Sequence, residues 1–204
     1  MIAVDCLQER ILAVVIGASA GGVEALSVLL PALPARLQAA VFIVVHTPRD
    51  RGSLLAEIFA PRCAVPVREA EDKEAAAPGT VYFAPPDYHL LIDQGPALAL
   101  SADALVHYSR PSIDVLFESA ADIYGAHLMG IILSGANQDG AEGLAAVHRA
   151  GGVTVVQHPG NAPSPFMLES ALARTHADFV TSLDGIAAIL RALGGERGPS
   201  PERE

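Results

Sequence analysis

The stretch ILAVVIGASAGG at residues 11–22 decides the fold class. Its first part, Ile11–Ile16, is continuously apolar and ends at Gly17, as expected for a β-strand that is buried on both faces. The following glycines suit a tight turn into a helix, and Val23–Leu30 has helical spacing up to Pro31. Strands buried on both faces are typical of parallel sheets covered by helices, so we predict an α/β protein.

The same alternation of apolar runs and helical spacing continues along the chain. The predicted strands are Ile11–Ile16, Val41–Val45, Val65–Arg68, Leu128–Leu133, Val153–Gln157 and Asp178–Val180. The predicted helices are Val23–Leu30, Leu54–Ala60 with Ser53 as its cap, Pro111–Tyr124, Ala141–Ala150, Pro165–Arg174 and Ile186–Leu193. Three short runs favour antiparallel hairpins: Thr80–Ala84, Leu90–Asp93 and Ala97–Leu100. We predict a doubly wound, mostly parallel sheet with helices on both faces and an antiparallel hairpin edge.

The composition excludes several classes of function. The chain has 204 residues, 51% of them hydrophobic, and 13 basic against 23 acidic residues give a formal net charge of −10. No stretch gathers the basic residues into the patch that a nucleic-acid backbone or an anionic membrane surface would require. We therefore expect no nucleic-acid partner, and the length fits a single domain.

The two ends of the chain and the cysteines point to a cytoplasmic protein. Residues 1–10 are predicted to be a short lead-in without the positive charge of a signal peptide, residues 11–193 one domain, and residues 194–204 a disordered tail. Cys6 and Cys63 lie far apart with no CxxC pair, which indicates reduced thiols. Glu24, inside the long apolar stretch near the N-terminus, argues against membrane insertion.

The turn after the first predicted strand carries a serine, and two interpretations of it compete. A glycine turn can bind a dinucleotide, or its pattern G-x-S-x-G can expose Ser19 as a nucleophile. A dinucleotide site expects an acidic residue at the end of the next strand, but His46 stands there. A histidine in that place suits a general base for Ser19, while a purely structural turn remains the alternative.

A serine nucleophile requires a base and an acid that orients the base. Of the seven histidines only His46 and His158 directly follow predicted strands, and His46 is preferred because consecutive strands are usually neighbours. Asp139 follows another buried strand, where its alternative role is a helix cap. The predicted triad is therefore Ser19, His46 and Asp139, with no cofactor and no metal ion.

Other residues near the predicted strand ends are candidates for contact with the substrate. The backbone N–H of Ala20 and an N–H in the loop at Ala136 are the expected oxyanion donors. Arg110 begins a segment that opens a helix, where it would either clamp a carboxylate or peptide group or remain a solvated charge.

The chain resembles the catalytic domain of the CheB family, the bacterial chemotaxis protein-glutamate methylesterases. The segments that carry the resemblance are GASAGGVEAL at 17–26, VVHTP at 44–48, PGTVYFAPPDYHLLI at 78–92, RPSIDVLFESAA at 110–121, GIILSGANQDGAEGL at 130–144 and AGGVTVVQ at 150–157. The resemblance implies the same fold and the same triad. It also implies hydrolysis of glutamate methyl esters on cytoplasmic helices of chemoreceptors, with release of methanol, and in some members deamidation of glutamines.

The sequence departs from the family pattern around the predicted cleft. Thr47 replaces a methionine after the histidine, Ala20 replaces a threonine, and His158 replaces an acidic residue. The loop before the aspartate reads Gly-Ala-Asn instead of Gly-Met-Gly. Thr47 and His158 are therefore further candidates for substrate contact, and an esterase or amidase with another substrate, or a non-catalytic signalling adaptor, are the alternatives.

Family members typically carry an N-terminal receiver domain whose phosphorylation relieves a block of the active site. Only about ten residues precede the first predicted strand here, so the sequence predicts that this chain acts without a receiver domain of its own.

Overall fold

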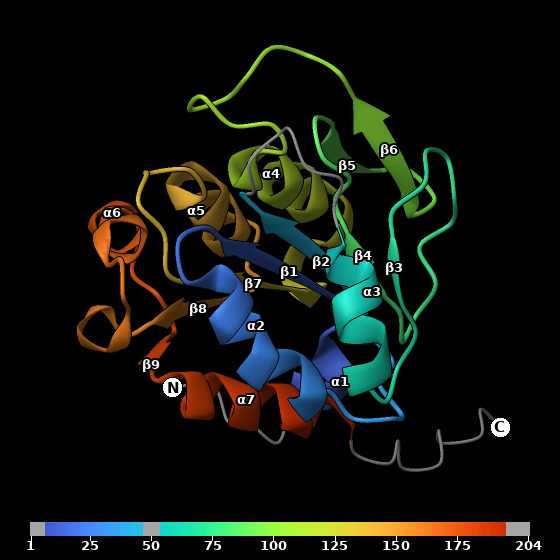
Figure 1. The fold of residues 1–204 in the computed structure, drawn as a ribbon, viewed down its shortest axis with the longest axis horizontal. Helices are drawn as coiled ribbons and strands as arrows, with labels where there is room; N and C mark the ends of the chain where they lie inside the picture. Colours follow the sequence, from blue (N-terminus) through green and yellow to red (C-terminus); the bar gives the residue numbers. More distant parts are fainter. Residues whose placement is uncertain (1–6, 47–53, 195–204) are drawn as a thin grey trace, which may run out of the picture.

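The computed structural model describes residues 7–46 and 54–194, and its centre is a seven-stranded parallel sheet (Figure 1). The sheet has the order β3-β4-β2-β1-β7-β8-β9. Its strands are β1 Ala13–Ala18, β2 Ala40–Val45, β3 Val67–Glu69, β4 Val81–Phe83, β7 Leu128–Ile132, β8 Val153–Gln157 and β9 Phe179–Thr181. A separate antiparallel pair consists of β5 His89–Asp93 and β6 Ala97–Ser101.

The helices cover both faces of this sheet. They are α1 Leu7–Arg10, α2 Gly22–Leu29, α3 Leu55–Phe59, α4 Ile113–Tyr124, α5 Ala141–Arg149, α6 Phe166–Arg174 and α7 Leu183–Arg191. Short 3-10 turns are found at Leu30–Ala32, Ala60–Arg62, Gly125–His127, Pro159–Asn161 and Ala192–Gly194. None of the helices within the described part of the chain is long and apolar enough to cross a bilayer.

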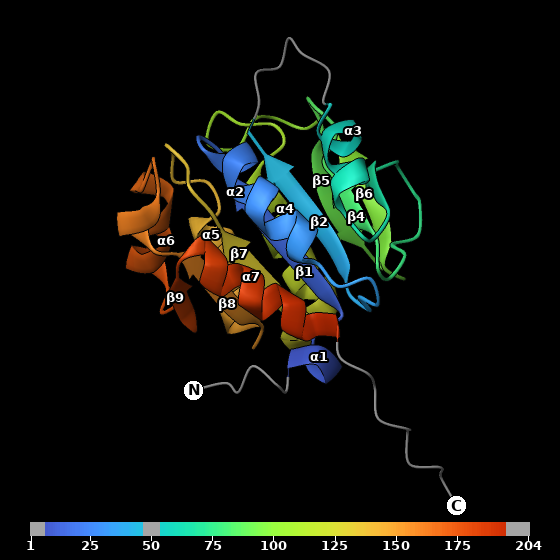
Figure 2. The same cartoon turned by 60° about the horizontal axis from the view of Figure 1, so that its bottom comes forward.

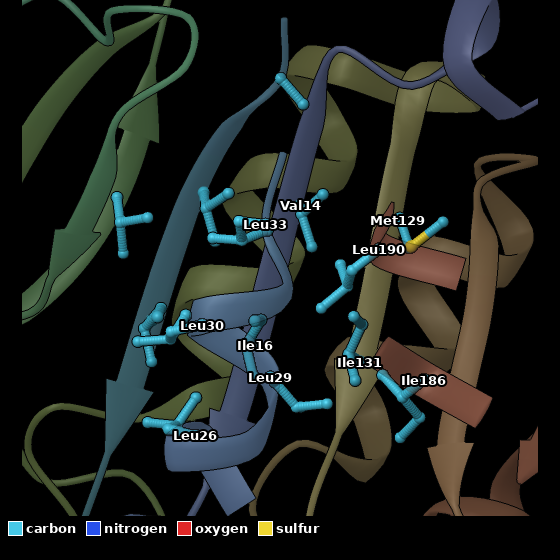
Figure 3. Close-up of a cluster of buried hydrophobic side chains, with 14 of the residues drawn as sticks. Val14, Ile16, Leu26, Leu29, Leu30, Leu33, Met129, Ile131, Ile186 and Leu190 are labelled. Carbon is cyan, nitrogen blue, oxygen red and sulfur yellow. The ribbon is translucent and has the colours of Figure 1, made fainter. Parts of the chain in front are cut away.

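The core consists of two apolar layers, one on each face of the sheet. Helices α2 and α7 lie together on one face, as Figure 2 shows, and Figure 3 shows their leucine and isoleucine side chains packed on β1 and β7. Leu26 and Ile186 are fully buried against Ile16 in this layer. The other layer holds side chains of α4, α5 and α6. Every residue of β1, β2, β7 and β8 is buried, so these strands are apolar on both faces apart from Thr154 and Gln157 of β8.

The predicted fold class is confirmed, with two differences in detail. The run Thr80–Ala84, predicted as hairpin material, contains β4, which pairs in parallel with both β2 and β3. The hairpin β5–β6 does not form an edge of the main sheet but packs on α4, where the Ile92 N–H donates to Ser119 Oγ over 3.1 Å. Three-residue strands carry too little periodicity to reveal their partner, because pairing depends on distant residues.

The N-terminal segment and the last helix also differ from the predicted boundaries. Within the predicted lead-in, Leu7–Arg10 is helical and Leu7 is fully buried in the core. Helix α7 begins at Leu183, three residues before the predicted start, because the Ser182 side chain accepts a hydrogen bond from Gly185 N and caps it. The proposed cap Ser53 lies outside the described residues.

Replacing Gly17 by alanine is expected to destabilise the protein. A Cβ at this position would lie 2.3 Å from Cγ2 of Ile113, which is fully buried. Overpacking of this kind typically costs about 1–3 kcal/mol. Denaturant unfolding of Gly17→Ala against the native chain measures this loss, and Gly160→Ala, whose Cβ would meet only the exposed His158 ring, is the control. Equal destabilisation by both variants would contradict the packing argument.

Candidate active site

Three neighbouring strands bring the predicted triad to one edge of the sheet. Strand β1 lies between β2 and β7, and Ser19, His46 and Asp139 follow the carboxyl ends of these three strands (Figure 1). The chain leaves β1 into α2 on one face and β7 into α5 on the other, so the strand order changes direction between them. Such a switch point opens a crevice at the carboxyl ends of the strands, where open α/β sheets bind ligands.

The turn after β1 holds Ser19 beside the loop that follows β7. The Ser19 N–H donates to Ser134 O over 2.9 Å, and Gly22 N donates to Ser19 O over 2.8 Å. Gly21 has a φ of 81°, a left-handed conformation that favours glycine, and a Cβ there would lie 2.5 Å from Cγ of Pro163. The glycines of the turn therefore give the tight geometry that a serine at a strand end requires.

The pairing of His46 with Asp139 is the central contact of the site. His46 Nε2 lies 2.9 Å from Asp139 Oδ2, and the His46 backbone N–H donates to Ala18 O, which ties β2 to β1 at this point. The Asp139 side chain is fully buried, whereas the His46 side chain is 13% exposed. Asp139 therefore contacts the ring at Nε2 from its buried side, and Nδ1 remains available to a second hydrogen-bond partner.

Asp139 is held by the first turn of α4 as well as by His46. Its Oδ1 accepts from Ser112 Oγ at 2.8 Å and from Asp114 N at 3.0 Å, and its Oδ2 accepts from Ile113 N at 2.7 Å. Burial alone would raise the pKa of this carboxyl, but the hydrogen bonds from His46 and the two backbone N–H groups outweigh it and lower the pKa below its ordinary value. Asp139 is thus ionised at neutral pH.

An ionised Asp139 fixes the tautomer of His46. A carboxylate only accepts hydrogen bonds, so Nε2 of the neutral ring carries the proton and Nδ1 carries the lone pair. Nδ1 is therefore the atom that is able to accept a proton from a nucleophile.

The glycine at position 135 lets the loop after β7 approach Ser19 closely. A Cβ built on Gly135 would lie 3.0 Å from Cβ of Ser19 and 2.4 Å from Cε of Met167, so no larger residue fits at position 135. Among the described residues the Ser19 hydroxyl makes no hydrogen bond. In unliganded active sites the hydrogen bonds between catalytic groups are often long or poorly aligned, and they tighten when substrate is bound.

Both predicted oxyanion donors lie at exposed positions of the two loops. Within residues 7–46 and 54–194, neither Ala20 N nor Ala136 N donates a backbone hydrogen bond. The loop of Ala136 is fixed on either side, because Gly135 N donates to Ser164 O at 3.0 Å and Gly135 O accepts from Met167 N at 3.0 Å. Two free N–H groups beside Ser19 are what a developing oxyanion requires.

A second histidine–carboxylate pair, His107 and Asp114, lies next to Asp139, which accepts a hydrogen bond from Asp114 N. Asp114 Oδ1 accepts from Gly140 N at 2.9 Å and Gly143 N at 2.7 Å. Its Oδ2 lies 3.3 Å from His107 Nε2, an ion-pair contact without hydrogen-bond geometry. Burial, and to a lesser degree the charge of Asp139, raise the pKa of Asp114 to about 6, although the N–H of Gly143 and the His107 charge act in the opposite direction.

This buried carboxyl predicts a pH dependence of the free energy of unfolding. Because its pKa is raised in the folded chain, Asp114 binds its proton more tightly there than in the unfolded chain. The stabilisation that this proton gives the folded chain is complete below about pH 4 and is lost as the pH rises to about 6. The free energy of unfolding of the native chain relative to Asp114→Asn should fall by about 2–3 kcal/mol across that interval. Urea unfolding at a series of pH values measures it. Asp122→Asn, at an exposed site of the same helix, is the control, and a flat difference would contradict the prediction.

Two of the three predicted substrate contacts, Arg110 and His158, have their described hydrogen bonds to residues outside the triad. The Arg110 guanidinium binds Asp87 Oδ1 through Nε at 3.1 Å and Nη2 at 2.7 Å, and its Nη1 donates to Ala102 O and Asp103 O. It therefore joins two loops, a role the sequence did not indicate. His158 is exposed and caps a turn by accepting from Gly160 N. Thr47 lies outside the described residues.

Sequence reasoning missed three residues that support the site. Ser112 caps α4 and donates to Asp139, and its position directly before a helix was the available signal. Asn137 contacts His46, and buried Gln157 accepts from Ser134 N at 3.0 Å. Nothing in their local sequence indicates these contacts, because the partners come from distant strands.

Comparison with known proteins finds relatives of one family. A family model described as CheB methylesterase matches residues 14–190. A putative protein-glutamate methylesterase/protein-glutamine glutaminase of Leptospira interrogans is 44% identical over 181 residues, which cover 89% of this chain and 94% of the relative. A protein-glutamate methylesterase/protein-glutamine glutaminase of Bordetella bronchiseptica is 39% identical over 189 residues, 91% of this chain but 54% of the relative.

A solved structure is similar over most of its length. The Thermotoga maritima CheB methylesterase catalytic domain superposes with a TM-score of 0.85 at 31% identity, covering 90% of this chain and 98% of that one. The two proteins therefore share the same fold over most of their length.

Proposed function

Because the chain belongs to the CheB methylesterase family, we propose that it is a protein-glutamate methylesterase that removes methyl esters from glutamate side chains of chemoreceptors. Its substrate would be the cytoplasmic helices of such receptors, which places the enzyme in the cytoplasm. The observation that carries the proposal is the 2.9 Å contact between His46 and buried Asp139 at the strand ends beside Ser19.

The proposed reaction begins with attack of Ser19 Oγ on the ester carbonyl. His46 Nδ1 takes the hydroxyl proton, and the resulting imidazolium is stabilised by the Asp139 carboxylate at Nε2. The N–H groups of Ala20 and Ala136 stabilise the oxyanion of the tetrahedral intermediate. When the intermediate collapses, the methoxy group leaves as methanol with the proton from Nδ1, and an acyl ester on Ser19 remains.

The second half of the reaction returns the enzyme to its starting state. A water molecule gives its proton to His46 Nδ1 and attacks the acyl ester, and a second tetrahedral intermediate forms in the same oxyanion site. Its collapse returns the proton from His46 Nδ1 to Ser19 Oγ and releases the glutamate side chain as a carboxylic acid, which gives its proton to the solvent. No step requires a metal ion or a redox cofactor.

Release of methanol tests the proposal directly. The purified chain is incubated with a cytoplasmic chemoreceptor fragment carrying methylated glutamates, and methanol is measured against the same fragment without methyl groups. We expect methanol in proportion to the esters lost. A folded chain that releases none would refute this substrate and favour an ester of another kind or a non-catalytic adaptor.

The names of the relatives support a second activity at the same site. The Leptospira and Bordetella proteins are both named protein-glutamine glutaminases as well as methylesterases. An amide carbonyl is attacked in the same way, with ammonia leaving in place of methanol, so we propose deamidation of receptor glutamines. Mass spectrometry of an unmethylated fragment detects it as a gain of about 1 Da at each converted glutamine, and an unchanged mass would exclude it.

A further inference from the structure

The side chain of Asn137 faces the nitrogen of His46 that the mechanism uses as its base. Asn137 Nδ2 lies 3.5 Å from His46 Nδ1 and 3.3 Å from Ser109 Oγ. Asn137 is half-buried in the loop between β7 and α5, two residues before Asp139. The ring of His46 is therefore held at both nitrogens, by a carboxylate at Nε2 and by an amide at Nδ1.

A backbone contact fixes which end of the Asn137 amide points to His46. The Asp139 N–H lies 3.3 Å from Asn137 Oδ1, and a backbone N–H can only donate. The oxygen must therefore face Asp139, which leaves the NH2 group to face His46 and Ser109. One of its hydrogens points to each partner, and the amide is a donor to Nδ1.

A donor at Nδ1 has a defined chemical effect. It stabilises the neutral ring, whose Nδ1 carries a lone pair, and opposes the imidazolium, whose Nδ1–H would meet the N–H of Asn137. Within the described residues the only charged group in contact with the ring is Asp139, which favours the imidazolium through Nε2. Asp114 and His107 lie beyond Asp139, joined to it through Asp114 N.

We propose that Asn137 is a positioning residue whose NH2 group faces the Nδ1 lone pair of His46 in the unliganded protein and favours the neutral ring, offsetting the effect of Asp139. The proposal rests on the proposed function for its kinetic consequence, but its chemical basis is a property of the unliganded protein. Ser109 supports the amide by accepting its second hydrogen. In the proposed reaction the Ser19 hydroxyl replaces the amide at Nδ1 before its proton is transferred.

Kinetics as a function of pH test the proposal with two variants. In Asn137→Ala the donor is lost, so the acid limb of the kcat/KM profile should move up by about 0.5–1 pH unit, as expected for one hydrogen bond. In Asn137→Asp a carboxylate faces Nδ1, and the limb should move up further, by about 1–2 units. For Asn137→Ala the rate should fall about 3–10-fold on the acid side and converge with the native rate at high pH.

Ser109→Ala is the graded control because it removes only the second partner of the amide. Its acid limb should move in the same direction as that of Asn137→Ala but by less. A loss of activity that is equal at every pH, with an unchanged acid limb, would overturn the proposal and leave Asn137 a purely structural residue of its loop.

A measurement without substrate separates this proposal from the proposed function. The ring C–H resonance of His46, assigned with a His46→Gln variant, is titrated by NMR in the native chain and in both Asn137 variants. The midpoints should rise in the order native, Asn137→Ala, Asn137→Asp, even if no ester is hydrolysed. Coincident midpoints would refute the role of Asn137 whatever the activity of the chain.

Discussion

Replacing Ser19 by alanine is expected to lower kcat for methyl-ester hydrolysis by about 10⁵- to 10⁶-fold, because Ser19 supplies the oxygen that forms the acyl ester in the proposed reaction. Binding and the oxyanion donors remain, so a residual rate of about 10³ over the uncatalysed reaction should persist. Ser19 lies in a turn that backbone hydrogen bonds hold, and its hydroxyl makes no bond among the described residues, so the fold should be unaffected. Steady-state methanol release measures the loss.

The matched control for this variant is Ser27→Ala. Ser27 lies in α2, the helix that follows the same turn, and its hydroxyl donates only to Val23 O within its own helix. Its activity should equal that of the native chain. If Ser19→Ala retained more than about a hundredth of the native kcat, far above what loss of a nucleophile allows, covalent catalysis by Ser19 would be contradicted.

Asp139→Asn is expected to lower kcat by about 10⁴-fold, as in other serine hydrolases in which the acid of a triad becomes an amide. An asparagine NH2 would donate to His46 Nε2, so the ring proton would move to Nδ1 and the base would lose its lone pair toward Ser19. The amide has one oxygen for the three donors Ser112 Oγ, Ile113 N and Asp114 N, which the carboxylate now satisfies.

The loss should appear in kcat and leave KM nearly unchanged, since Asp139 is fully buried and does not contact solvent or substrate. Asp122→Asn, an exposed carboxylate of α4, should have native activity and serves as the control. Native kcat in Asp139→Asn would mean that His46 does not require a carboxylate, and the triad would have to be abandoned.

Much of the sheet and the contact between His46 and Asp139 could be predicted because the deciding information is local. Each of β1, β2 and β7 is a short apolar run, and parallel strands place the residues after them at one edge of the sheet. Ser19, His46 and Asp139 each directly follow or lie close behind such a run. The strand ends alone therefore predict that these three residues lie at the same edge of the sheet, and the structure shows His46 and Asp139 in contact there.

The remaining contacts depend on residues that are distant in sequence. Arg110 binds Asp87, 23 residues away, and no local pattern distinguishes this loop clamp from a free substrate-binding guanidinium. The orientation of Asn137 toward His46 follows from a contact across 91 residues. The prediction of a hairpin at Thr80–Ala84 is wrong because the three residues of β4 have no periodicity that separates parallel from antiparallel pairing.

The kcat of the double variant Ser19→Ala with Asp139→Asn tests most directly whether Ser19, His46 and Asp139 act as one catalytic unit. Residues that act in the same step have non-additive effects, because the acid has nothing to assist once the nucleophile is gone. We predict that methanol release by the double variant equals that of Ser19→Ala alone. A further loss approaching the product of the two single effects would contradict the account, because Asp139 would then act independently of Ser19.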